Sequence, residues 1–147
     1  MSTLTATRAA VTGPLRDWLR SQYDITSLCG TDPVLNEPSI YAGGLAGGAV
    51  LPAVVVTKVG LNAGATATET HLLQFDCWAD RGQAANAETL AAAVKTALES
   101  ATPGTVLGTS FVRLLGAAIE AEAALPDPDD GTPRYVVTAS VTTTVVA

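Results

Sequence analysis

Residues 74–83 read Gln-Phe-Asp-Cys-Trp-Ala-Asp-Arg-Gly-Gln, and this stretch decides how the fold is interpreted. It brings together a cysteine, an arginine, a tryptophan and two aspartates, as an active site could. Apolar and polar residues alternate through it, however, and the alternation begins further upstream. The pattern predicts a strand over residues 69–79 whose odd positions face the core from Leu73 onward. Residues 84–100 then repeat apolar side chains at helical spacing, so the stretch is interpreted as a strand that leads into a helix.

Distance along this strand excludes a catalytic Cys–His pair. His71 and Cys77 are six residues apart, which is about 20 Å in an intact strand, whereas a nucleophile and its base need hydrogen-bond contact. On the apolar face, Cys77 is expected to be a small buried hydrophobic residue. His71, the single histidine of the chain, is expected to be a surface residue at the end of the strand rather than a base.

Downstream of the helix, the sequence predicts two long strands joined by a turn. Residues 111–125 and 134–146 alternate apolar with polar side chains, and residues 126–133 carry the prolines, aspartates and glycine that are typical of a turn. Glu120 and Glu122 are expected on one face of the first of these strands. The polar side of both strands indicates a sheet that is at least partly antiparallel and open on one face.

Upstream, the pattern is less regular. Residues 1–11 are interpreted as a loose N-terminal arm, and apolar residues at helical spacing predict a helix over 14–23. Residues 30–52 are rich in loop-forming residues, apart from a short strand expected at 39–41. The β-branched residues that follow predict a further strand over 53–59.

Together these elements predict an α+β protein with one domain that spans residues 1–147. We expect a mixed or antiparallel sheet of about four strands, with two helices packed on one of its faces. A chain of 147 residues has the length of a single domain with a core of its own.

Charge and composition exclude several classes of protein. Only 15% of the residues are charged, the net charge is −6, and the eight lysines and arginines are scattered along the chain. Specific nucleic-acid binding is not expected, because it needs clustered basic residues. So little charge, with 48% hydrophobic residues, indicates a surface that is covered in an oligomer or a larger assembly.

Motifs for cofactors and metals are incomplete. Cys29 and Cys77 have no metal-ligand spacing and are expected to be free thiols of an intracellular protein, since neither a signal peptide nor a membrane-spanning run is predicted. The glycines at 43 and 48 have the spacing of a phosphate-binding loop but lack its lysine. Residues 127–138 begin like a calcium loop but end in threonine where glutamate is required. We therefore expect no enzyme activity, no cofactor and no metal.

Six segments follow one another along the chain, namely PLRDWLRSQ, ITSLCG, SIYAG, LPAVVVTKV, LLQFDCWADRG and AETLAAAVKTALES. After them come a strand, the segment PDPDDGTPRY and a closing Thr/Val strand. This series resembles the tail terminator, or tail completion, proteins of long-tailed bacteriophages over nearly the whole chain. The most telling pieces are the strand-to-helix passage at 75–78 and the closing strand from Pro133. They are structural landmarks rather than catalytic signatures.

The resemblance implies a structural virion protein that forms a ring of six copies, caps the tail tube and joins it to the head-neck complex. Its partners would be further copies of itself, the tail tube protein and a neck or head-closure protein. Genomic DNA would pass through the hole without specific binding, and no membrane would be involved. The protein would be made in the cytoplasm of the bacterial host and reside at the head–tail junction of the virion. The alternative in the same virion is a head-closure or neck adaptor, and those outside it are a small enzyme and a soluble binding module.

Two groups of residues are candidate assembly sites under this hypothesis. Acidic residues would line the lumen and repel DNA, unless the turn that holds the aspartates lies on the outside of the ring; they are Glu120, Glu122, Asp127, Asp129 and Asp130. The glycine-rich loop 42–51 and the loop 61–68 would dock against the tube or against neighbouring subunits. The candidate residues of these loops are Gly43, Gly44, Gly47, Gly48, Asn62 and Gly64.

Overall fold

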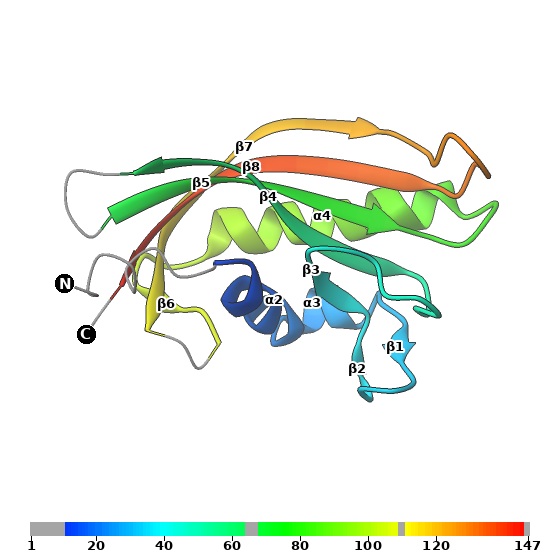
Figure 1. Cartoon of the computed structure of the whole chain (residues 1–147), viewed down its shortest axis with the longest axis horizontal. Coiled ribbons are helices and arrows are strands. Elements are labelled where there is room, and N and C mark those ends of the chain that lie inside the picture. The colour runs from blue at the N-terminus through cyan, green and yellow to red at the C-terminus, as the bar shows by residue number, and fades with distance from the viewer. Residues whose placement is uncertain (1–10, 64–67, 109–110, 146–147) are drawn as a thin grey trace.

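Four long strands form the centre of the structure, a computed structural model that describes residues 11–63, 68–108 and 111–145 (Figure 1). They are β4 (Ala53–Ala63), β5 (Thr68–Trp78), β7 (Val112–Ala124) and β8 (Arg134–Val145). Neighbours in the order β4-β5-β8-β7 are all antiparallel. Because β5 is paired on both sides, it lies inside the sheet.

Two short strands complete the sheet and make it mixed. β3 (Ile40–Ala42) runs parallel to β4, and β6 (Thr105–Val106) pairs with the outer side of β7, so the sheet has six strands in the order β3-β4-β5-β8-β7-β6. β1 (Thr31–Asp32) and β2 (Glu37–Pro38) form a separate two-stranded hairpin. The expected mixed α+β architecture is confirmed. The expected number of strands was too low, because strands of two or three residues show no alternation.

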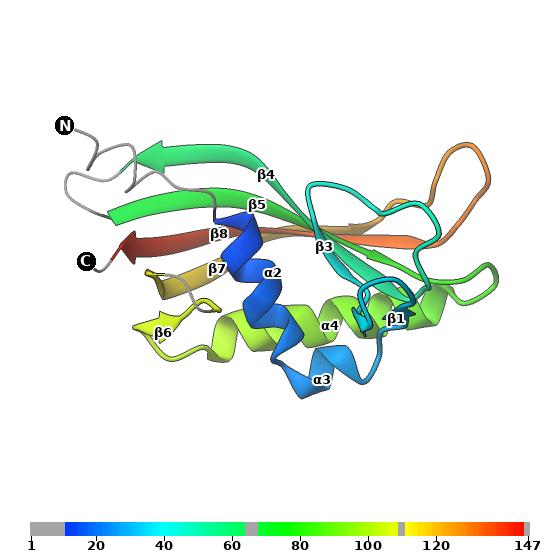
Figure 2. The same ribbon diagram turned by 60° about the horizontal axis from the view of Figure 1, so that its bottom comes forward.

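One face of the sheet is covered by helices (Figures 1 and 2), which are α2 (Thr12–Arg20), α3 (Tyr23–Thr26) and α4 (Ala84–Ser100). α4 has the predicted bounds. The helix predicted over 14–23 is divided instead, since Gln22 has an extended backbone with a ψ of 105° and Ser21 Oγ bonds back to the carbonyl of Trp18 at 2.5 Å. The described residues therefore contain three helices where two were expected.

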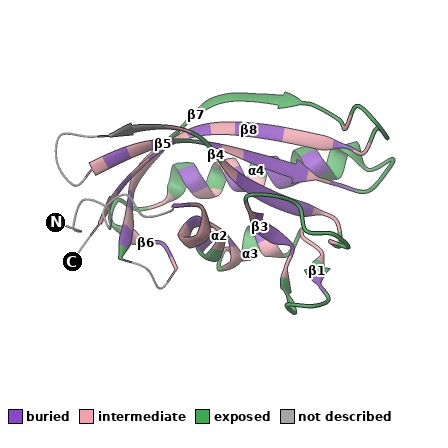
Figure 3. Ribbon diagram, in the orientation of Figure 1, coloured by how far each residue is buried: buried purple, intermediate pink, exposed green. Residues whose placement is uncertain are grey.

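The core lies between the helices and the sheet face that they cover, here called the inner face (Figure 3). Leu73, Phe75 and Cys77 of β5 are fully buried in it, as the alternation predicted. The apolar stripe of α4 packs against them. Val11, which was placed in the expected arm 1–11, is also buried in this core, whereas the rest of that arm lies outside the described residues.

His71 is buried too, and its predicted position at the surface was wrong. The residue is 2% exposed, and its Nε2 lies 3.0 Å from Oγ1 of Thr143. β4 extends beyond the predicted 53–59 to Ala63, so His71 is paired on both sides, with Leu61 of β4 and Val141 of β8. Burial lowers the pKa of this imidazole, and the charge of Lys58 lowers it further.

β-Bulges interrupt the alternation of two strands. β4 has one at residues 58–60, and β7 has two, the second at residues 119–121. Past this second bulge, Glu122 is paired with the buried Val137, so its side chain lies on the inner face. The expectation that Glu120 and Glu122 alternate regularly on one face fails here, because a bulge inserts one extra residue into the strand.

Candidate assembly surfaces

Three connections meet at one end of the sheet, here called the turn end. β4 starts at Ala53, opposite Trp78 at the end of β5, and Trp78 is paired in turn with Arg134 at the start of β8. The connections before β4, after β5 and between β7 and β8 therefore gather on the right of Figure 1. β4 ends at Ala63, which is paired with Glu69 near the start of β5, at the opposite end of the sheet. Of the two predicted docking loops, 42–51 thus precedes β4 at the turn end, whereas the described residues of 61–68 lie at the opposite end.

The glycine-rich loop 42–51 is exposed in its middle and anchored where it approaches β4. Its candidate residues, all exposed, are Gly43, Gly44, Gly47 and Gly48. Gly43 and Gly48 have φ angles of 90° and 75°, which glycine adopts without the strain that other residues incur. Near the end of the loop, Leu51 packs with Trp78 in a small apolar cluster that is separate from the main core. The loop therefore offers exposed glycines on a defined base, with Leu45 and Val50 as its exposed large side chains.

The second predicted docking loop is shorter than expected. Asn62 is paired with Thr70 and belongs to β4, so its assignment to a loop was wrong. Pairing with β5 extends the strand into small polar residues whose own propensity for strand is low. Gly64 lies outside the described residues.

The acidic turn between β7 and β8 uses two of its three aspartates internally. Asp127 Oδ1 accepts the backbone N–H of Asp129 at 2.8 Å, and Asp130 Oδ1 accepts that of Thr132 at 2.9 Å. The bond from Thr132 holds the pKa of Asp130 below its ordinary value. Arg81 Nη2 also donates to the carbonyl of Asp130 at 2.8 Å. Two carboxylates therefore shape the turn, while Asp129 is exposed beside them.

The two candidate glutamates of β7 have different surroundings. Glu122 Oε2 lies 2.7 Å from Lys95 Nζ, and Oε1 accepts the hydroxyl of Tyr135 at 2.7 Å. These bonds from Lys95 and Tyr135 hold the pKa of Glu122 below its ordinary value. Glu120 is exposed and forms no ion pair with any residue that the structure describes. The structure thus compensates the charge of Glu122 and leaves that of Glu120 uncompensated.

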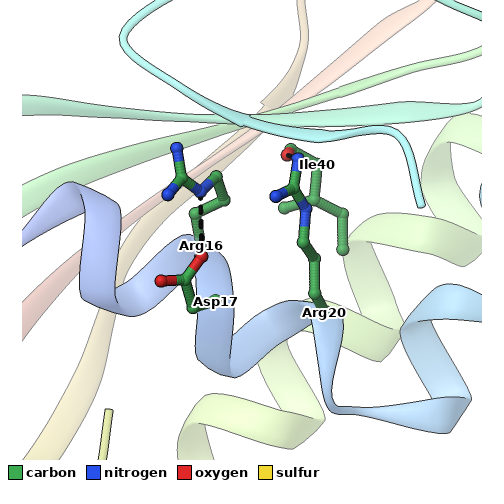
Figure 4. Close-up of polar contacts among 4 residues, drawn as sticks. All are labelled: Arg16, Asp17, Arg20 and Ile40. Carbon is green, nitrogen blue, oxygen red and sulfur yellow. Dashed lines mark hydrogen bonds and ion pairs between the residues drawn. The ribbon is translucent and has the colours of Figure 1, made fainter. Parts of the chain in front are cut away.

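Helix α2 closes part of one sheet edge through Arg20 (Figure 4). Arg20 Nη2 donates to the carbonyl oxygen of Ile40 in β3 at 2.7 Å. Ser39 uses its carbonyl to accept a bond from β4, so the next carbonyl, that of Ile40, points away from β4 to the outside of the sheet. Arg16, one turn earlier, pairs with its neighbour Asp17 at 3.1 Å instead. Arg20 therefore satisfies an acceptor that an edge strand would otherwise leave open.

The β1–β2 hairpin presents an apolar tip that the sequence analysis missed. Asp32 is buried; its Oδ1 accepts the backbone N–H groups of Val34 and Leu35 at 2.9 Å each, and its Oδ2 accepts the hydroxyl of Tyr41 at 2.6 Å. Val34 is 89% exposed and Leu35 is 55% exposed. The available signal was an aspartate just before a proline, because aspartate side chains bond to nearby backbone in turns.

Both cysteines are free thiols, as expected. Burial raises the pKa of Cys29 to about 12 and also raises the pKa of Cys77, whereas a nucleophilic cysteine needs a lowered pKa. Within residues 11–63, 68–108 and 111–145, no three potential metal ligands are grouped so that they could hold an ion. The helices of this part of the chain are too short or too polar to cross a membrane.

Known proteins match this chain both in family and in fold. Residues 13–144 match the family model described as tail completion protein gp17. Among solved structures, the chain is similar in fold to a chain of the structure titled "Virion of native gene transfer agent (GTA) particle", with a TM-score of 0.59 and 22% sequence identity over 92% of this chain and 98% of that chain. No curated protein sequence matches.

Proposed function

Because this chain belongs to the family of tail completion protein gp17, whose members are structural proteins of phage-like virions, we propose that it forms a ring that caps the tail tube and joins it to the head-neck complex. The observation that carries the proposal is the extent of the family match, since residues 13–144 include nearly all of the described fold. The ring is inferred to have six members. Its partners are further copies of this chain, the tail tube protein and a neck or head-closure protein.

The composition of the chain supports a role in contact rather than catalysis. A surface with few charges is suited to burial against other subunits, and only 15% of the residues are charged. The net charge of −6 is suited to a channel through which DNA passes without being retained, since like charges repel. We assign the lumen to the turn end, where Asp127, Asp129 and Asp130 lie. The glycine-rich loop 42–51 is at the same end and would dock there against the tube or a neighbouring subunit.

Omission of this chain from particle assembly tests the proposed position. We expect filled heads that are not attached to tails, together with tails of irregular length, because the tube end lacks its cap. Tails of normal length beside unattached, leaking heads would instead favour a head-closure or neck adaptor role. Joined, normal particles would contradict both roles.

A further inference from the structure

The two outer strands of the sheet cover their neighbours only in part. β3 is paired with β4 at residues 54–56, and β6 is paired with β7 at Arg113 and Leu114. Within the described part of the chain, no strand pairs with the outer side of β4 over residues 57–63 or of β7 over residues 115–124. Such open edges present unpaired backbone N–H and C=O groups, which ready them for pairing with another chain.

The open parts of the two edges lie at the same level of the sheet. Pairing can be followed across β4, β5, β8 and β7, and each row then joins one residue of β4 to one of β7. Thr57 shares its row with Ala121, Lys58 shares its row with Ile119, and Asn62 shares its row with Gly116. The open windows 57–62 and 116–121 therefore coincide, because β3 and β6 cover opposite ends of the sheet.

Strand direction also suits pairing between copies. Three antiparallel steps separate β4 from β7, so the two strands run in opposite directions. A second copy placed beside the first without a shift along the strands would therefore bring its β7 edge antiparallel to the β4 edge of the first. Antiparallel edges in register form a hydrogen-bonded ladder, here on either side of the β-bulges at residues 58–60 and 119–121.

Opposite charges mark the two windows. Lys58 is exposed on the β4 edge, and Glu120 is exposed at the β7 edge, next to the residue that shares the row of Lys58. Neither side chain forms an ion pair with the residues described. Most side chains of the β7 window are small, since it reads Gly-Ala-Ala-Ile-Glu-Ala, so a neighbouring strand can approach closely.

We propose that neighbouring copies of this chain join edge to edge, the β4 window 57–62 of one copy pairing with the β7 window 116–121 of the next, with Lys58 beside Glu120. This inference rests on the ring of the proposed function and specifies how its members meet. The two edges differ from each other, so the contact is heterologous, and such contacts close into rings when the rotation between copies allows it. Lysines and bulges on an edge discourage non-specific pairing, and an acidic partner strand makes the pairing selective.

A charge exchange tests the contact. Particles are assembled with Lys58→Glu, with Glu120→Lys, with the double variant or with the control Glu99→Lys, which changes an exposed charge on α4 outside both windows. Like charges across an interface oppose association, so we expect each single edge variant to lower the copies per particle at least about tenfold. The double variant should restore most of them, and the control should match the wild type. Single variants that incorporate normally, or a double variant as poor as the singles, would overturn the proposal.

Cross-linking separates failure of this contact from failure of the ring itself. Thr57→Cys and Ala121→Cys are combined in one chain, because antiparallel partners lie within the Cα separation that a disulfide spans. Oxidised particles should yield a ladder of linked copies, absent from the wild type, which keeps Cys29 and Cys77, and from a Thr57→Cys/Ser100→Cys control. A ring seen by imaging without this ladder would overturn the edge contact and leave the proposed function standing. Particles that hold the chain but no ring would overturn both.

Discussion

The rest of the chain covers the inner face of the sheet more completely than it covers the two edges of the same sheet. On the inner face, apolar side chains such as Phe75 are fully buried beneath α2 and α4. Along the edges, β3 and β6 stop short and leave backbone and charged side chains open. Burial of apolar area dominates folding stability, whereas an open edge contributes only when another chain pairs with it. The difference teaches that folding and assembly depend on separate parts of one sheet.

The largest effect is expected from an inner-face substitution. Phe75→Ala should lower the free energy of unfolding by about 3–5 kcal/mol, because it leaves a cavity in a closed core. Urea denaturation followed by circular dichroism measures this. Lys58→Ala is the matched edge variant and should lie within about 0.5 kcal/mol of the wild type. Comparable losses in both variants would break the distinction between face and edge.

A smaller substitution on the inner face sharpens the same comparison. Cys77→Ala should cost about 1 kcal/mol or more through a small cavity, and particles should still assemble with the folded variant. In the native wild type, Cys77 should react slowly with thiol reagents because it is fully buried and its pKa is raised. Fast labelling of the native protein, with loss of assembly after blocking, would show that this position is not merely structural.

The β1–β2 hairpin lies outside the sheet and provides a local, pH-dependent effect. The bond from Tyr41, followed by that from the Leu35 backbone, lowers the pKa of Asp32 from its ordinary value of 3.8. The stability that this carboxylate contributes is therefore present above pH 3.8 and is lost as the pH falls through its lower folded value. Tyr41→Phe removes the first cause, so stability should fall less steeply upon acidification below pH 4. Urea midpoints at neutral and acidic pH measure this, and identical pH dependence in both proteins would contradict it.

The smallest effect on stability is expected at the acidic turn. Asp129 is exposed, and its carboxylate is not one of the two that shape the turn. Asp129→Lys should leave the unfolding midpoint unchanged. If the turn end faces the lumen, particles with this variant should retain DNA at low salt and release it as salt rises. Unchanged DNA release at every salt concentration would place the turn on the outer rim.

The long helices and strands could be predicted from the sequence, whereas the short strands at the edges of the sheet could not. β5, α4 and β8 carry their own alternation or helical spacing, so their bounds were predicted to within one residue or so. Short strands such as β6 exist only because a long neighbour pairs with them. The error at His71 has a related origin, since pairing with β5 extends β4 beyond its own sequence pattern and places Leu61 beside His71.

The candidate sites show the same limit. The acidic residues could be found from their sequence, but the ion pair of Glu122 with Lys95 depends on packing between β7 and α4. The relation between Lys58 and Glu120 depends on a register carried through four strands. Residues that are distant along the chain acquire such a relation only through pairing, which no local pattern records.

The most direct test of the ring and its edge contact is an averaged electron-microscopy map of particles that contain this chain. We expect a closed ring of copies at the end of the tail tube, in which β4 of each copy continues into β7 of the next as one sheet. The map would contradict this if single copies sat apart from one another, or if neighbouring copies met through their helices and left both sheet edges facing solvent.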